Sequence, residues 1–315
     1  MRSNGESGTM LTADTLRGVW ALVATPWDEN YEFDEGTFRH DVAYQCRSGV
    51  YGLYTGGSAA EFFALEFAEF RRCTDVFLEE VKKTGMAHQI GCTWSDTRGA
   101  LRRAEYAVEH GAEAVQVAFP YYIGLTVEEG FRFLEDLARA CGPVPLIHYG
   151  SGKCKLMFEA EDYRRLKERV PTVIGTKLTK GDPLWFARIC EKNPELSHFG
   201  GEYTFVADFA GGASGIYSWI GVTNPRLALE WYEACRRGDW NRAMEIQVLV
   251  NRFKLNVKLK WHGQSNAAVN KADAAINPNI HCNLRVRAPY DSCIPEDIEL
   301  ARDWARDNFP ELLEL

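Results

Sequence analysis

The sequence has no apolar run that approaches the roughly 20 residues a helix needs to cross a lipid bilayer. Its first fifteen residues are polar and lack the apolar core of a secretory signal peptide. We therefore expect no membrane partner. We also expect residues 1–16 to form a flexible tail, because polar termini that are not tied into a fold are rarely ordered.

Cysteines, histidines and basic residues are arranged in ways that exclude further classes of function. The nine cysteines show no CxxC or paired spacing, so we expect reduced thiols in a cytoplasmic protein. The seven histidines show no HxH or HExxH spacing, and we predict no metal site. A formal net charge of −8 argues against a nucleic-acid partner, although a pocket can still be locally basic.

What the sequence does contain is a repeated alternation of short apolar runs and amphipathic segments. With 46% hydrophobic and 25% charged residues, the chain can bury a large core. The apolar runs predict eight strands, at 19–24, 52–54, 87–91, 114–118, 144–149, 173–177, 197–199 and 215–219. The segments between them predict helices, at 38–46, 67–81, 97–110, 127–140, 160–169 and 183–192, with Arg102, Arg103 and Glu105 on the solvent side of the third.

This alternation predicts an α/β fold. Strands separated by helices in units of about 25 residues imply parallel βαβ units with right-handed crossovers. Eight units over about 220 residues fit a (β/α)8 TIM barrel better than a doubly wound sheet. No GxGxxG opens the first unit, which disfavours a dinucleotide-binding fold.

The last part of the chain shows helical spacing without intervening strands, at 227–237, 240–257 and 296–308. Pro295, Glu296 and Asp297 are typical of a helix start. We therefore predict a barrel over 17–224 and a C-terminal helical region over 225–315 that packs on it.

The sixth predicted strand ends on a lysine. In such barrels the active site lies at the C-terminal ends of the strands, which is where Lys177 falls. Burial disfavours the charged form of an amine, and a neutral lysine can attack a carbonyl to form a Schiff base. Lys177 is therefore a candidate nucleophile. The alternative is a solvated lysine at the end of a strand.

The fifth predicted strand ends in His148 and Tyr149. Because successive side chains alternate between the two faces of a strand, only one of the pair points to the barrel axis. An inward Tyr149 beside an inward Lys177 would place a proton relay next to an amine. His148 is then expected to be a packing residue rather than a base.

The segment after the second predicted strand is a candidate anion site. Gly56 and Gly57 allow backbone amides to approach a ligand, and Ser58 stands where the next helix begins. Amides at a helix N-terminus attract carboxylates. Alternatively, Ser58 is only a helix N-cap.

Four segments together resemble one known family: LVATPW at 22–27, GGSAAE at 56–61, PLIHY at 145–149 and GTK at 175–177. PYY at 120–122 adds a weaker match. In this order and spacing they resemble the dihydrodipicolinate synthase and N-acetylneuraminate lyase family of class I aldolases and dehydratases. The resemblance extends from Gly18 to about Leu313, nearly the whole chain.

The resemblance implies a role for each matching residue. Lys177 would form an imine with a 2-oxo acid, typically pyruvate, without a cofactor. Tyr149 would shuttle protons. Ser58, with the backbone amides of Ser58 and Ala59 that follow Gly57, would hold the substrate carboxylate and pass protons to Tyr149. Tyr122 would reach into the site of a neighbouring subunit, so the resemblance implies a homo-oligomer, either a dimer or a tetramer built as a dimer of dimers. The alternative for Tyr122 is a surface or packing tyrosine.

The chain also departs from the family pattern. Ala59 and Ala60 replace a hydroxyl residue and a glycine of the loop. The arginine that dihydrodipicolinate synthases use after the tyrosine is absent, and Lys153 is a partial substitute for it in binding substrate. Trp94 and Trp219 follow predicted strands, and each lines the pocket or fills space between the barrel and the helices. Glu202 and Asp208 are expected to be solvated or capping residues.

These inferences favour a lyase that acts on a 2-oxo acid through a Lys177 imine, with pyruvate-dependent aldol cleavage or condensation preferred. Dehydration of a 2-keto-3-deoxy sugar acid and dihydrodipicolinate synthesis are alternative reactions. A further alternative, which Ala59 and Ala60 keep open, is a non-catalytic barrel that serves as a binding protein.

Overall fold

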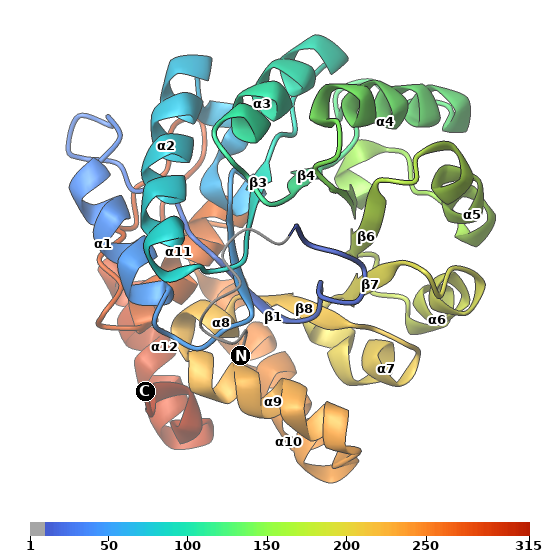
Figure 1. The fold of residues 1–315 in the computed structure, drawn as a ribbon. Coiled ribbons are helices and arrows are strands. Elements are labelled where there is room, and N and C mark those ends of the chain that lie inside the picture. The colour runs from blue at the N-terminus through green and yellow to red at the C-terminus, as the bar shows by residue number, and fades with distance from the viewer. Residues whose placement is uncertain (1–9) are drawn as a thin grey trace. The chain divides into compact units, whose positions relative to one another are not determined.

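The structure, a computed structural model, describes residues 10–315, and its strands and helices alternate along the chain (Figure 1). Eight parallel strands form a closed barrel in chain order. The strands are β1 (Gly18–Leu22), β2 (Gly52–Thr55), β3 (His88–Gly91), β4 (Val115–Val117), β5 (Leu146–Gly150), β6 (Val173–Leu178), β7 (Ser197–Gly200) and β8 (Gly215–Ser218). The predicted TIM barrel is confirmed.

Helices follow the strands as expected of βαβ units. They are α1 (Glu35–Gln45), α2 (Phe67–Thr84), α3 (Thr97–Glu109), α4 (Val127–Cys141), α5 (Ala160–Arg169), α6 (Pro183–Lys192), α7 (Phe205–Ala210) and α8 (Ile220–Thr223). The predicted C-terminal helical extension is also present, as α9 (Pro225–Arg237), α10 (Trp240–Asn256), α11 (Asn266–Ile276) and α12 (Pro295–Asn308). None of the helices within residues 10–315 is long and apolar enough to cross a membrane.

The chain divides into two compact units. The first comprises the described residues up to Gly18 together with Ala87–Tyr217, and it holds β3 to β7, most of β8 and helices α3 to α7. The second comprises Val19–Met86 and Ser218–Leu315, and it holds most of β1, β2, α1, α2 and α8 to α12. The predicted barrel boundaries at residues 17 and 224 stay predictions.

Most of the predicted tail, residues 1–9, lies outside the described residues. In its described part, Leu16 is fully buried, and its carbonyl accepts a hydrogen bond from the Ser197 hydroxyl. Packing in the first unit therefore begins before residue 17.

Two further details differ from expectation. Arg103 was placed on the solvent side of α3, but it is only 4% exposed, because its guanidinium stacks 3.4 Å from the centre of the Trp94 ring. Helix α11 was not predicted. Its buried face consists mainly of alanines together with Lys271 and Asp273, so the large apolar side chains that reveal helical periodicity are missing.

Candidate active site

The pairing of β5 with β6 brings together two predicted site residues. Tyr149 and Lys177 are direct register partners, and the Lys177 amine lies 4.6 Å from the centre of the Tyr149 ring. Both residues stand at the C-terminal ends of their strands, where the active sites of parallel barrels form. The structure therefore places an amine and a phenol side by side.

The neighbouring positions face the other way. His148 Nδ1 lies 3.0 Å from the hydroxyl of Tyr163 on α5, and Thr176 Oγ1 lies 2.8 Å from His198 Nδ1. His148 is fully buried and packs on Phe119, and burial lowers its pKa to about 3. A histidine that stays neutral in such surroundings is a packing residue, as expected. By alternation, Tyr149 and Lys177 face the barrel interior.

The surroundings of Lys177 favour its neutral form. Burial lowers the pKa of Lys177 to about 7, which is the dominant effect. The positive charge of Lys153, in the turn after β5, lowers the pKa further, whereas the negative charge of Glu202 raises it. Glu202 thus influences the amine electrostatically, a role its sequence position did not suggest. Because a lysine with this pKa is about half neutral at pH 7, it is able to act as a nucleophile.

A polar cluster inside the first unit was missed by sequence reasoning. Tyr217 on β8 donates a hydrogen bond of 2.9 Å to Gln89 Oε1 on β3, and Gln116 Nε2 on β4 donates one of 3.1 Å to the same oxygen. The Tyr217 ring also lies 4.8 Å from the Lys177 amine. Gln116 is a single polar residue between two valines in a short strand, a pattern that could have marked it as facing the barrel interior. Gln89 follows His88, so the sequence offered no such signal for it.

Ser58 lies in the second unit, where it begins a short 3-10 helix (Ser58–Ala60) directly after Gly57. Its side chain caps no helix, so the N-cap alternative is wrong. Instead, Ser58 Oγ accepts a hydrogen bond of 2.9 Å from Asn266 Nδ2 at the start of α11. No sequence motif pointed to Asn266, because the two residues are brought together only by the fold.

A buried ion pair anchors the loop that carries Ser58. Glu61 adopts a left-handed conformation with φ of 56°, and its Oε1 accepts hydrogen bonds from Lys271 Nζ at 2.5 Å and Trp27 Nε1 at 2.9 Å. Its Oε2 accepts one from the backbone amide of Arg287 at 2.9 Å. Glu61 and Lys271 are both fully buried. Buried charges persist only when they are paired in this way.

The remaining predicted site residues lie apart from these contacts. Trp219 is 3% exposed and stacks on Phe253 with 5.4 Å between the ring centres. The Lys258 amine lies 4.0 Å from the centre of the Trp219 ring. These are the contacts of a packing residue, and its predicted contact with substrate stays a prediction. Tyr122, after β4, is 77% exposed, and its carbonyl accepts a hydrogen bond from Lys155 Nζ at 2.6 Å. Its role in a neighbouring subunit stays a prediction.

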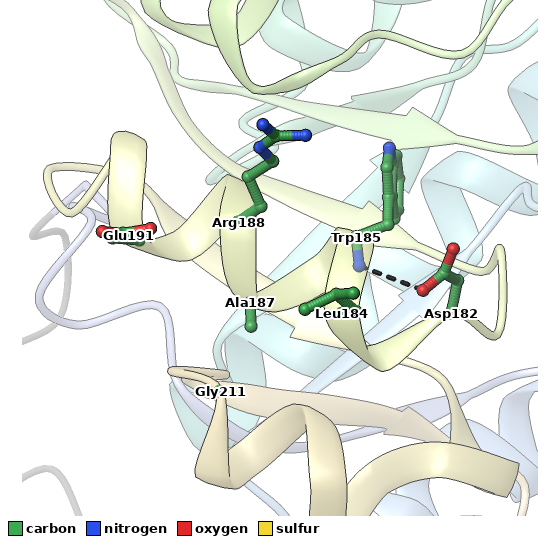
Figure 2. Close-up of a pocket in the computed structure, with 7 residues that line it drawn as sticks. All are labelled: Asp182, Leu184, Trp185, Ala187, Arg188, Glu191 and Gly211. Carbon is green, nitrogen blue, oxygen red and sulfur yellow. Dashed lines mark hydrogen bonds between the residues drawn. The ribbon is translucent and has the colours of Figure 1, made fainter.

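One surface pocket, of about 810 Å³, lies along α6 in the first unit (Figure 2). The Asp182 carboxylate in it accepts a hydrogen bond of 3.0 Å from the Trp185 amide and so acts as the helix N-cap. None of the predicted site residues lines it. Among residues 10–315, no group of three or more His, Cys, Asp or Glu side chains is arranged to hold a metal ion.

Comparisons of the sequence with known proteins identify relatives of two kinds. The model of the dihydrodipicolinate synthetase family matches residues 15–277. A 4-hydroxy-tetrahydrodipicolinate synthase from Bartonella bacilliformis is 27% identical over 237 residues, which cover 73% of this chain and 79% of that enzyme. An N-acetylneuraminate lyase from Escherichia coli is 26% identical over 247 residues, which cover 76% of this chain and 81% of that enzyme.

Solved structures share the fold. A sialic acid aldolase from Ruminococcus gnavus, a catalytic lysine mutant, matches with a TM-score of 0.86 at 19% identity, over 95% of this chain and 99% of that one. A prophage protein of the dihydrodipicolinic acid synthase family from E. coli K12, in complex with pyruvate, matches with a TM-score of 0.83 at 17% identity, over 93% and 98%. At such identities the likeness shows the fold alone.

The ion pair of Glu61 and Lys271 predicts a large effect on stability. Replacing Glu61 by alanine leaves Lys271 charged and buried without its partner, so we expect the free energy of unfolding to fall by roughly 3–5 kcal/mol. Urea denaturation of the wild type and the variant measures this loss. The matched control is the double variant Glu61→Leu and Lys271→Met, which should recover part of it. An equal loss in the single and double variants would contradict the interpretation.

The lowered pKa of Lys177 predicts a pH dependence for its reaction with pyruvate. Only the neutral amine attacks a carbonyl, so the rate of imine formation should rise with pH and level off above a midpoint near 7. The rate of adduct formation, trapped with borohydride from about pH 5 to 9, measures the midpoint. A free lysine derivative treated in parallel serves as the control. A protein midpoint as high as that of the free amine would show that Lys177 is not desolvated.

Proposed function

Because the chain belongs to the dihydrodipicolinate synthetase family of class I aldolases and lyases, we propose that it acts on a 2-oxo acid through a Schiff base on Lys177. The proposal rests on the position of Tyr149 beside the amine of Lys177, whose pKa is lowered to about 7. A nucleophilic lysine with a phenol within reach is the minimum that imine chemistry requires.

The proposed reaction begins at the amine of Lys177. The neutral amine of Lys177 attacks the carbonyl carbon of the 2-oxo acid and forms a carbinolamine. The hydroxyl then leaves as water with a proton that Tyr149 delivers, and an iminium remains. In cleavage, the electron pair of the bond between carbons 3 and 4 moves toward the iminium and leaves an enamine, while the 4-hydroxyl loses its proton and becomes the carbonyl of the released aldehyde. A proton then adds to carbon 3 of the enamine and restores the iminium, and condensation runs these steps in reverse. Hydrolysis of the imine returns the free amine and the product.

We propose pyruvate-dependent aldol cleavage or condensation as the reaction. One relative is named for a lyase reaction on N-acetylneuraminate, and the E. coli K12 protein of similar fold was solved in complex with pyruvate. Pyruvate is therefore the first 2-oxo acid to test. Dihydrodipicolinate synthesis is less favoured, because Lys153 stands near the position where those synthases carry an arginine and is a point charge without a bidentate fork.

The other residue roles belong to the same proposal and rest on the resemblance of their motifs to those of the family. The Ser58 hydroxyl and the amides that follow Gly57 would bind the substrate carboxylate, with Ala59 contributing only its backbone. Lys153 and Trp219 would contact the rest of the substrate. A cytoplasmic location is also part of the proposal, and it rests on the cysteine pattern of the sequence.

Borohydride trapping with pyruvate tests the central step. We expect intact mass to show one reduced pyruvate adduct and peptide mapping to place it on Lys177, because reduction makes the imine permanent. Lys177→Arg keeps the charge but removes the reactive amine, and it should yield no adduct. Tyr149→Phe should lower the turnover rate by roughly 10²- to 10⁴-fold while leaving Lys177 available. If the folded protein forms no adduct with pyruvate or with a panel of larger 2-oxo acids, the proposal is wrong, and the alternative of a non-catalytic binding protein is favoured.

Complementation between subunits tests the proposed role of Tyr122. If Tyr122 completes the site of a neighbouring subunit, Lys177→Ala and Tyr122→Ala are each inactive or weak alone. Mixed after dissociation and reassembly, they should form some sites with both residues intact. Random pairing in a dimer restores about a quarter of the wild-type activity per subunit. Sedimentation of each variant checks that assembly is unaffected. Recovery of no activity on mixing, or a fully active monomer, would refute the role.

A further inference from the structure

We propose that Tyr217 is a positioning residue that, together with Tyr149, holds the charged nitrogen of Lys177 between two aromatic rings. The proposal deepens the function proposed above and rests on it, because the nitrogen that the rings flank is the one that would carry the imine. Tyr217 has no counterpart among the residues to which the family motifs assign a role.

Two aromatic rings lie close to the amine. The Lys177 nitrogen lies 4.6 Å from the centre of the Tyr149 ring on β5 and 4.8 Å from that of Tyr217 on β8. Both distances lie within the roughly 6 Å over which a ring face attracts a cation. Tyr217 is 7% exposed, so water has little access to its ring.

The Tyr217 ring is held in place by neighbours from three strands. Its hydroxyl donates to Gln89 Oε1 at 2.9 Å, and Gln116 donates to the same oxygen. On β7, Phe199 packs against it with 4.7 Å between ring centres. Burial also raises the pKa of Tyr217 above its ordinary value, so the hydroxyl stays protonated. The hydroxyl is thus an anchor, and the part of Tyr217 presented to Lys177 is its ring.

An aromatic ring suits the two demands that imine chemistry makes on this nitrogen. The amine must be neutral to attack, yet the iminium is permanently charged. A close carboxylate would stabilise the charged amine strongly and hold its pKa high. A ring attracts a cation more weakly than a carboxylate does, so desolvation still lowers the pKa of Lys177. The ring face nevertheless stabilises the positive charge of the iminium. The charged groups that act on the amine are Glu202, which favours the cation, and Lys153, which opposes it.

Two variants separate the ring from its hydroxyl. Tyr217→Phe keeps the ring, and Tyr217→Leu removes it but stays apolar. We expect the phenylalanine variant to resemble the wild type in the pH midpoint of adduct formation. The leucine variant should show a lower midpoint, and its yield of trapped pyruvate adduct should fall roughly 3- to 30-fold, the range expected for the loss of one cation–π contact. The fall should appear in turnover more than in KM, because the iminium forms after substrate binds.

The control is Tyr163→Phe, which removes the hydroxyl of a different tyrosine of the same unit, one that is fully buried and contacts His148 on the outer face of β5. It should leave the midpoint unchanged, although it destabilises the fold. Tyr217→Met provides a second ring-free variant if the leucine variant does not fold. A midpoint that stays constant or rises in the ring-free variants would overturn the proposal, since Tyr217 would then act only by excluding water.

A second measurement separates this proposal from the proposed function. The rate at which a small acylating reagent labels Lys177, followed by peptide mass against pH, reports the amine's pKa without any substrate. If neither pyruvate nor the larger 2-oxo acids give an adduct on the wild type, the proposed function fails. The labelling midpoint still decides whether Tyr217 stabilises the charged amine: it should fall in Tyr217→Leu and stay in Tyr217→Phe, and the reverse pattern would refute the positioning role.

Discussion

The register between β5 and β6 is the constraint on which the candidate site depends. It makes Tyr149 and Lys177 direct partners at the ends of their strands. Because side chains alternate along a strand, a slip of one residue would turn His148 or Thr176 inward in place of one of them. Those two residues now contact Tyr163 and His198 on the outer face. The same alternation therefore places the two candidate residues side by side and builds the packing that holds the strands in place.

Around this pair, desolvation inside the barrel has two electrostatic effects. Desolvation lowers the pKa of Lys177 to about 7, which makes an amine nucleophilic near neutrality. The same desolvation raises the free-energy cost of polar groups that lack a hydrogen bond. The hydroxyl of Tyr217 and the amide of Gln116 both donate hydrogen bonds to Gln89 Oε1. In the second unit, Lys271 remains buried beside a close carboxylate, Glu61. Lys271 is thus paired with an anion, whereas Lys177 lies beside two aromatic rings, so the two lysines have different electrostatic surroundings.

Much of the fold could be predicted because its determinants are local. Short runs of three to six residues and the helical periods between them depend on nearest neighbours along the chain, and all eight strands were found in this way. Prediction failed where local pattern is weak or long-range contacts dominate. Helix α11 buries alanines and charged residues, so it lacks the apolar period. Arg103 is charged, yet it is buried against Trp94, which lies nine positions earlier in the segment between β3 and α3.

The sequence by itself determined the order of the eight strands and of most of the helices, the position of Lys177 at a strand end and the motifs that mark the family, since all of these are patterns along the chain. Only the tertiary structure decided which groups surround the Lys177 amine. Tyr217 and Glu202 come from β8 and from the turn after β7, and a pKa depends on through-space burial and charge that no local pattern records. The partnership of Ser58 with Asn266 joins residues 208 positions apart, so it too exists only once the chain has folded.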